Sequence, residues 1–275
     1  MDRRRVLQLT AASVALAATK GQAMASTPAF SSASSQQLRD IVLVHGAWHG
    51  GWCWRHAARL LAAAGHRVSA PTLTGLGERA HLQSAAVDLD THIADVIAHI
   101  TAEELERVVL VGHSYGGFVV RGAAARLPDT IAQVIYLDAF VPEHGDVVAT
   151  YAGDARAQEI RDSVAHDGAA TLPPLPAAVF GLSDPSQAAW VTRRMTPQPA
   201  KTYLQPLDLG GRHAHPPHPA YITCMAPKLD VFDATRASIK AAPDWRYVEL
   251  QQGHDVMVSA PELLARTLLS LFQSI

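Results

Sequence analysis

The sequence is low in charged residues and in cysteine. Of its 275 residues, 17% are charged and 48% are hydrophobic, and the formal net charge is −2. No basic block follows the N-terminal segment, which argues against a nucleic-acid partner, because phosphates require a surface of lysine and arginine. Cys53 and Cys224 are the two cysteines, too few for a disulfide framework, and we expect buried free thiols. The composition is typical of a globular chain with a large core.

The first 25 residues have a different character from the rest. Arginines at positions 3–5 precede an apolar run from Val6 to Ala18, and the sequence AMA follows at 23–25. This order is typical of an export signal with an A-x-A cleavage site, and the run is too short to be a membrane anchor. The adjacent arginines predict a twin-arginine signal and a periplasmic or secreted protein, with Sec export as the alternative. Residues 26–39 are expected to form a flexible, Ser-rich leader.

From Asp40 onward, short apolar runs alternate with helical segments. The apolar runs are continuous rather than alternating, which is typical of a sheet covered by helices on both faces. Alternation of strands and helices with short connections predicts an α/β fold with a mostly parallel, doubly wound sheet. The expected strands are 41–45, 67–70, 108–112, 134–138, 221–224 and 247–250, and the expected helices are 54–64, 91–102, 115–127, 234–241 and 261–272.

The alternation stops between residues 142 and 219. This segment is rich in proline and contains isolated aromatic residues, and a structureless loop of such length is uncommon in a compact domain. We therefore expect an inserted cap, or lid, over the carboxyl ends of the strands, with short helices near 155–164 and 186–195. The core domain would then consist of residues 40–141 and 220–275.

The sequence GHSYG at 112–116 matches the pattern G-x-S-x-G. The pattern alone is weak, because glycine and serine are common, but here it follows an apolar strand and opens a helix. That setting is typical of a nucleophile elbow, in which glycines two residues before and after the serine relieve steric clashes in a strained turn. Ser114 is therefore the predicted nucleophile.

A serine nucleophile needs a base and an oxyanion site. His254 lies after the last expected strand and directly before the C-terminal helix, and this position distinguishes it among the fourteen histidines. An imidazole there could take the serine proton and return it to the leaving group. The loop after the first strand, HGAW at 45–48, predicts the amide of Ala47 as one oxyanion donor and that of Tyr115 as the second.

Six stretches together resemble one branch of the α/β-hydrolase superfamily: VLVHGAWHGGWCW, APTLTGLGER, GHSYGG, YLDAFVP, RMTPQPAKTYLQPL and GHDVM. That branch includes plant methylesterases, hydroxynitrile lyases and bacterial pyrethroid hydrolases, and the bacterial esterases are the closer match. The resemblance runs from about residue 40 to the C-terminus. It implies a cofactor-free carboxylesterase with a Ser/His/acid triad and a lid-covered pocket. The expected substrate is a small-molecule ester with bulky hydrophobic groups. The candidate pocket residues are Trp48, Phe140, Phe180, Trp190 and Tyr203.

The acid of the triad departs from the pattern of the relatives. They are expected to carry Asp or Glu two or three residues after the cysteine, where Ala226 and Pro227 stand here. Two carboxylates remain, Asp138 at the end of the strand after the elbow helix and Asp230 in a later loop. Asp138 is preferred because a strand end is placed more rigidly than a loop, and the base requires a fixed orientation.

Two other functions compete with ester hydrolysis. Hydroxynitrile lyases of this branch typically carry threonine after the first strand's histidine and lysine after the catalytic histidine. Gly46 and Asp255 occupy those positions, which disfavours a lyase. Some relatives bind hormones without turnover, and the presence of both Ser114 and His254 argues against such a binding protein.

Two further patterns are interpreted as loops. The three histidines of RHAHPPHP at 212–219 are irregularly spaced and lack a nearby cysteine or acid, which disfavours a metal site. The sequence GLGER at 75–79 lacks the further glycine or the Lys-Ser pair that phosphate-binding loops use. Neither a metal nor a cofactor is expected, and a homodimer is left open.

Overall fold

The computed structural model describes residues 38–168, 170–212, 214–216 and 218–272. The predicted export signal at 1–25 and most of the predicted leader at 26–39 lie outside the described residues. None of the helices in the described part has both the length and the apolarity needed to cross a membrane.

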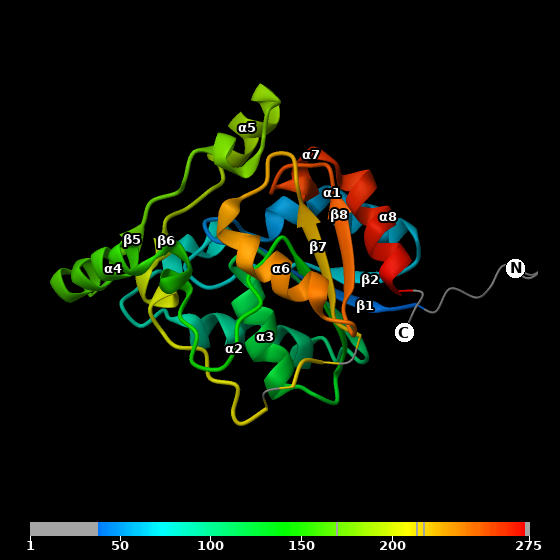
Figure 1. Ribbon diagram of the computed structural model, residues 1–275, viewed down its shortest axis with the longest axis horizontal. Coiled ribbons are helices and arrows are strands. Elements are labelled where there is room, and N and C mark those ends of the chain that lie inside the picture. Colours follow the sequence, from blue (N-terminus) through cyan, green and yellow to red (C-terminus); the bar gives the residue numbers. More distant parts are fainter. Residues whose placement is uncertain (1–37, 169, 213, 217, 273–275) are drawn as a thin grey trace, which may run out of the picture. The chain divides into compact units, whose positions relative to one another are not determined.

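A six-stranded parallel sheet forms the centre of the fold (Figure 1), in the order β2-β1-β3-β4-β7-β8. Each predicted strand is present, with ends that differ by up to three residues. The chain places β2 on one side of β1 and β3 on the other, and ligand sites of such sheets lie at the carboxyl ends beside this switch point. The strands are β1 (Asp40–Val44), β2 (Arg67–Ser69), β3 (Val108–His113), β4 (Ile131–Leu137), β7 (Ala220–Cys224) and β8 (Arg246–Leu250).

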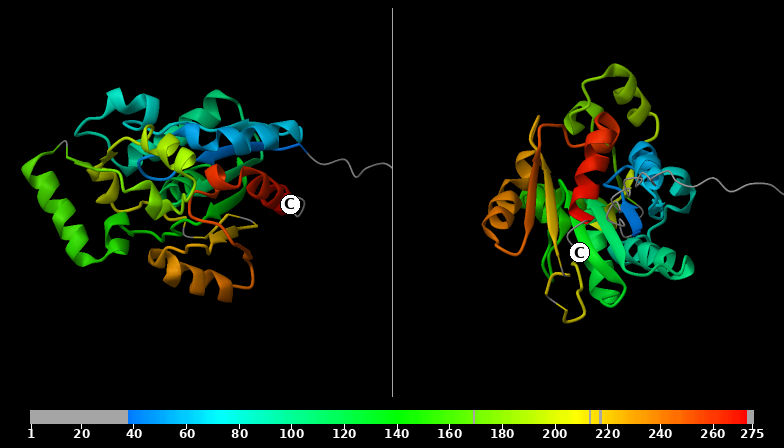
Figure 2. Two further views of the ribbon diagram at one scale, coloured as in Figure 1. Left: turned by 90° about the horizontal axis from the view of Figure 1, so that it is seen from above. Right: turned by 90° about the vertical axis from the view of Figure 1, so that its right-hand side faces the viewer.

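Helices cover both faces of the sheet, which explains why its central strands are continuously apolar. Leu61, Met257 and Leu268 belong to the apolar cluster on one face, and Ile93 and Ile239 to the cluster on the other. The right-hand view of Figure 2 shows α6 (orange) and α8 (red) on opposite sides of β7 and β8. The first face carries α1 (Arg55–Ala63), α7 (Val256–Ser259) and α8 (Pro261–Phe272), and the second carries α2 (Leu89–Ala102), α3 (Gly116–Arg126) and α6 (Asp233–Ala241).

Local sequence explains where some helices begin. Asp88 accepts a hydrogen bond from the amide of Thr91 at 2.9 Å in a capping box, so α2 begins at Leu89, two residues before the predicted start. The segment Gly51–Trp54 forms a separate 3-10 helix, η1, ahead of α1. The short helix α7, directly after Asp255, was not predicted, because four residues are too few to show a helical period.

The chain leaves the sheet after Leu137 and returns at Ala220. The intervening segment contains α4 (Asp154–His166), α5 (Pro185–Thr192) and a small antiparallel pair of β5 (Thr171–Leu172) and β6 (Gln198–Pro199). Figure 1 shows α4 and α5 standing apart from the sheet. An apolar cluster of its own includes Ile160 and Leu172. Below, "cap" means residues 142–219.

Three hydrogen bonds tie the cap to the loop that follows β1. The indole of Trp48 donates to the carbonyl oxygen of Leu172 at 3.0 Å, and the carbonyl oxygen of Trp48 accepts from the amide of Thr196 at 2.9 Å. The amide of Trp48 donates to the side-chain oxygen of Gln198 at 3.1 Å. Since this loop leads from the carboxyl end of β1, the cap is attached where a ligand site is expected.

Candidate active site

Ser114 lies in the turn between β3 and α3, in the left-handed backbone region with φ of 55°. Its carbonyl oxygen accepts hydrogen bonds from the amides of Gly117 at 3.0 Å and Phe140 at 3.3 Å. A side chain at Gly112 would place Cβ 2.8 Å from the carbonyl oxygen of Gly116, and one at Gly116 would come equally close to that of His45. The turn therefore requires both glycines, and it leaves Ser114 partly exposed among buried neighbours.

The loop after β1 passes directly over this turn. A Cβ atom added at Gly46 would lie 2.9 Å from Cβ of Ser114 and 2.9 Å from Nδ1 of His113. The following residue, Ala47, is 4% exposed, and Trp48 has a φ of 64°. Glycine at position 46 thus permits the close approach that brings Ala47 near Ser114.

His254 follows β8 and is held against a buried carboxylate. Its Nδ1 donates to Oδ2 of Asp138 at 2.7 Å, and the two residues are 2% and 0% exposed. The imidazole is stacked between the rings of Phe180 and Phe232, whose centroids lie 6.0 and 5.6 Å away. The hydrogen bond and the two rings fix the orientation of the imidazole, which is what a general base requires.

Asp138 is surrounded by donors. Besides His254, its carboxylate accepts from the amide of Cys224 at 3.1 Å, the hydroxyl of Thr223 at 3.2 Å and the guanidinium of Arg236 at 3.3 Å. These bonds satisfy a charge that would otherwise be costly to bury. In contrast, the side chain of Asp230 is 84% exposed and lies 3.2 Å from Lys228. Of the two carboxylates that the sequence left open, the structure places Asp138 against His254.

His113, which precedes Ser114, connects the elbow to the loop after β8 that carries His254, called the base loop below. Its Nε2 donates to the carbonyl oxygen of His254 at 3.2 Å, and the two rings are 4.3 Å apart. Burial lowers the pKa of His113 well below its usual value, and the neighbouring His254 lowers it further. The ring of His113 is therefore neutral and holds the elbow against the loop of His254, a role that the G-x-S-x-G motif did not predict although it contains this residue.

Four of the five predicted pocket residues lie in two aromatic groups that meet at His254. Trp48 is 6.1 Å from Phe180 and 6.4 Å from Tyr203 between ring centroids, and Tyr203 stacks on Tyr115 at 5.7 Å. The ring of Phe140 is 4.8 Å from Phe232, one of the two rings that enclose His254. These side chains come from the core and from the cap alike.

Trp190 lies elsewhere. It makes an edge contact with Trp52 at 5.1 Å, and the guanidinium of Arg194 covers its ring at 4.5 Å. The ring of Trp52 in turn stacks on His49 at 5.1 Å. Trp190 thus packs on Trp52 of η1 rather than on Trp48 or Phe140.

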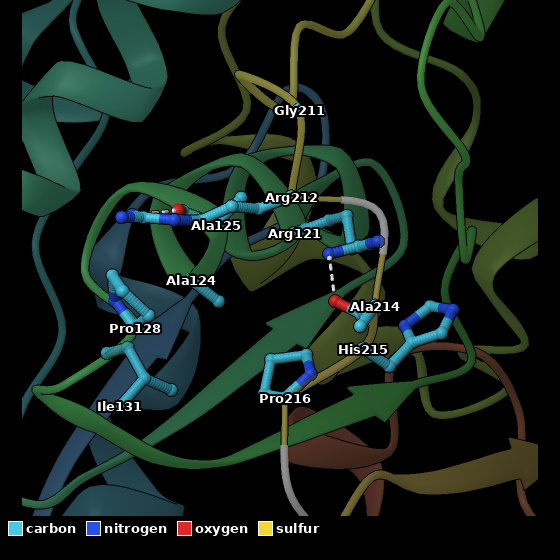
Figure 3. A pocket seen from close by; sticks show the side chains of 10 residues that line it. All are labelled: Arg121, Ala124, Ala125, Pro128, Ile131, Gly211, Arg212, Ala214, His215 and Pro216. Atoms are coloured by element: carbon cyan, nitrogen blue, oxygen red, sulfur yellow. Dashed lines mark hydrogen bonds between the residues drawn. The ribbon is translucent and has the colours of Figure 1, made fainter.

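A separate hollow of about 450 Å³ lies at the carboxyl end of α3 (Figure 3). There, Arg121 donates to the carbonyl oxygen of Ala214 at 3.3 Å, and Arg212 and His215 of the histidine-rich stretch form part of the wall. Nε2 of His215 lies 3.4 Å from Glu143. Within the described residues, no group of three or more His, Cys, Asp or Glu side chains could hold a metal ion.

Residues 41–267 match the sequence model of the alpha/beta hydrolase family. This range covers most of the chain and includes the elbow, the whole cap and the loop that carries His254. The protein belongs to this family, as its sequence motifs indicated.

Esterases are prominent among its relatives. The carbendazim hydrolyzing esterase of Nocardioides sp. (strain SG-4G) is 43% identical over 242 residues, which make up 85% of this chain and 100% of that protein. Methylesterase 10 of Arabidopsis thaliana is 38% identical over 40% of each chain. A pyrethroid hydrolase from Sphingobium faniae JZ-2 has 25% identity and a TM-score of 0.65, covering 86% of this chain and 98% of its own. These relatives, together with the fold, identify a carboxylic ester hydrolase.

An extracellular α/β-hydrolase from a Paenibacillus species shares the fold, with a TM-score of 0.73 at 24% identity. The superposition covers 85% of this chain and 98% of that one.

The ion pair of Asp138 with Arg236 makes a testable contribution to stability. Arg236→Met leaves the buried carboxylate without its guanidinium partner, so we expect the free energy of unfolding to fall by about 3 kcal/mol. Lys240→Met on the same helix removes an exposed ion pair with Glu249 and a cation–π contact with Tyr247, and should lower the free energy of unfolding by less than about 1 kcal/mol. Urea denaturation of both variants at pH 7 measures the difference, and equal effects would contradict a buried role for Arg236.

Proposed function

We propose that the protein is a serine esterase that hydrolyses bulky, hydrophobic carboxylic esters through an acyl-enzyme. The observation that carries the proposal is the buried hydrogen bond of 2.7 Å between His254 and Asp138, next to the strained turn of Ser114. Contact of His113 with the base loop brings this pair to the elbow. A nucleophile, a base and an acid from three strand ends form the arrangement that acyl transfer requires.

The reaction begins when the hydroxyl oxygen of Ser114 attacks the ester carbonyl carbon while Nε2 of His254 takes the hydroxyl proton. Asp138 accepts the hydrogen bond from Nδ1 and stabilises the imidazolium that forms. The amides of Ala47 and Tyr115 donate to the oxyanion of the tetrahedral intermediate. Collapse breaks the ester C–O bond, and His254 gives its proton to the leaving alcohol. Water, activated by His254, then hydrolyses the acyl-enzyme.

The proposed substrate class follows from the aromatic residues near the base. Trp48, Phe180 and Tyr203 meet in one group, and Phe140 reaches His254 through Phe232. Apolar and aromatic surroundings with few charged groups suit esters with large hydrophobic parts. The names of two relatives, a carbendazim hydrolyzing esterase and a pyrethroid hydrolase, support the same class.

The lyase alternative gains no support from Asp255. Its side chain is fully buried and lies 3.1 Å from Nε2 of His49, which directs it away from a substrate. Esterase activity is therefore the function that the arrangement favours.

The roles of the triad residues are tested by three variants assayed on p-nitrophenyl butyrate. Ser114→Ala and Asp138→Asn should each lower kcat by about a thousandfold or more with the fold intact, whereas Asp230→Asn should change little. A fluorophosphonate should label the wild-type protein at Ser114. Near-normal activity of Ser114→Ala, or an effect of Asp230→Asn that exceeds that of Asp138→Asn, would refute the assignment.

The hydrophobic substrate class is tested by a series of p-nitrophenyl esters. We expect kcat/KM to rise from acetate to longer and aromatic acyl groups, because the aromatic residues gain contact area with the substrate. Carbendazim and a synthetic pyrethroid complete the series. Preference for acetate or for charged esters would rule out the proposed pocket.

We also propose export through the N-terminal segment, which the sequence pattern supports. Expressed in a bacterium with both export routes, the protein should be recovered from the periplasm with Ser26 as its first residue. Replacement of the arginines at 3–5 by lysine preserves charge and should retain the full-length chain in the cytoplasm. Continued export of this variant would indicate the Sec route, and cytoplasmic wild-type protein would refute export.

A further inference from the structure

A second pair of histidine and carboxylate lies beside the proposed triad. Nε2 of His49 is 3.1 Å from Oδ2 of Asp255, and Nδ1 of the same ring is 2.8 Å from the carbonyl oxygen of Ala47. His49 and Asp255 are 1% and 0% exposed. Asp255 directly follows the base His254, and Ala47 is a proposed oxyanion donor. The pair therefore links the base loop to the loop after β1 that carries Ala47, called the oxyanion loop below.

The peptide group between Ala47 and Trp48 is held on both sides. Nδ1 of His49 donates to the carbonyl oxygen of Ala47. The amide N–H of Trp48 donates to the side-chain oxygen of Gln198, which is fully buried in the cap. Trp48 adopts a positive φ of 64°, a conformation that needs such support in a residue other than glycine. Holding this peptide fixes the conformation of Ala47 and, with it, the direction of its amide.

The partners of His49 also define its protonation state. A carbonyl oxygen and a carboxylate both accept hydrogen bonds, so the ring satisfies them together only when both nitrogens carry protons. His45 provides the contrast, since its Nδ1 donates to the carbonyl oxygen of Gly46 while its Nε2 accepts from the amide of Leu73. A neutral ring suits His45, and burial lowers its pKa to about 3.

Asp255 is the acidic group that faces His49, and the other neighbours described below are neutral. Burial, the largest influence, lowers the pKa of His49, but the charge and hydrogen bond of Asp255 and the bond to Ala47 outweigh it, so the pKa is raised. His113, 6.5 Å away, is kept neutral by burial, as is the Cys53 thiol, whose pKa burial and Asp255 raise. The rings of Trp52 and Phe180 cover the remaining sides.

We propose that His49 and Asp255 form a buried ion pair that positions the oxyanion loop for ester hydrolysis. Both act as positioning residues, because they reach the reaction through Ala47 and His254 rather than through the substrate. The inference rests on the proposed esterase function and extends it to residues outside the triad.

The ion pair predicts a specific pH dependence. The pKa of His49 in the folded protein is raised above its unfolded value. The contribution of the pair to the stability of the folded protein is therefore complete below about pH 6.5, and it is lost as the pH rises through the folded-state pKa. A neutral ring can donate to only one of its two acceptors. The alkaline decline of kcat should therefore contain the titration of His49.

Three variants test the pair in the full-length protein with p-nitrophenyl butyrate. His49→Gln should lower kcat roughly 10- to 100-fold with KM nearly unchanged, and should slow phosphonylation of Ser114 by the same factor, because both reactions use the oxyanion site. Asp255→Asn should lower kcat less and shift the alkaline limb to lower pH. The double variant should be no slower than His49→Gln, since the two residues act as one unit.

His66→Gln serves as the matched control, because His66 is also a buried histidine, 4% exposed, but lies before β2. It should leave kcat and the pH profile unchanged. Rates are expressed per active site titrated with the fluorophosphonate, so loss of folded protein does not count as loss of rate. Wild-type kcat in His49→Gln, or an unshifted alkaline limb in Asp255→Asn, would overturn the inference. Full activity of Ser114→Ala would instead overturn the proposed esterase mechanism, so the two failures are distinguishable.

Discussion

The hydrogen bond between Asp138 and His254 organises the carboxyl edge of the sheet. A buried carboxylate must be surrounded by donors, and those of Asp138 come from the end of β7, from α6 and from the loop after β8. These elements converge on one carboxylate at the end of β4. The position of α6 is thereby coupled to the position of the proposed base, because Arg236 on that helix contacts the same carboxylate.

The cap is part of this organisation rather than an independent cover. Its Gln198 and Leu172 hold Trp48 in the loop after β1, and its Phe180 stacks on His254. The carbonyl oxygen of Phe180 also accepts from the amide of Asp255 at 3.0 Å. Through these contacts one inserted segment touches both the loop that carries the proposed oxyanion donor and the loop that carries the proposed base. Sequence variation in the cap can therefore alter the positions of both loops.

Five histidines lie around the elbow, and their partners differ: His45, His49, His92, His113 and His254. Burial keeps His45, His92 and His113 uncharged by lowering the pKa of each ring, that of His92 to about 4. His49 and His254 each face a carboxylate. A positive charge is costly to bury unless an acid accompanies it, so neutral rings can stand beside the proposed ion pair of His49 without adding charge to the site.

The sequence by itself determined the elements whose signals are local. Continuous apolar runs such as 108–112 and 221–224 predicted a parallel sheet covered on both faces, and the glycines around Ser114 predicted the tight turn that the structure contains. The position of His254 after the last strand followed from chain order alone.

Only the tertiary structure decided which acid meets His254, because Asp138 lies 116 residues away and the contact depends on β7 and β8 following β4 in the sheet. The pairing of His49 with Asp255 and the packing of Trp190 on Trp52 were likewise decided by the tertiary structure. Such contacts join segments that are distant in the chain. Their geometry is set by strand order and packing, for which no local pattern of residues provides a signal.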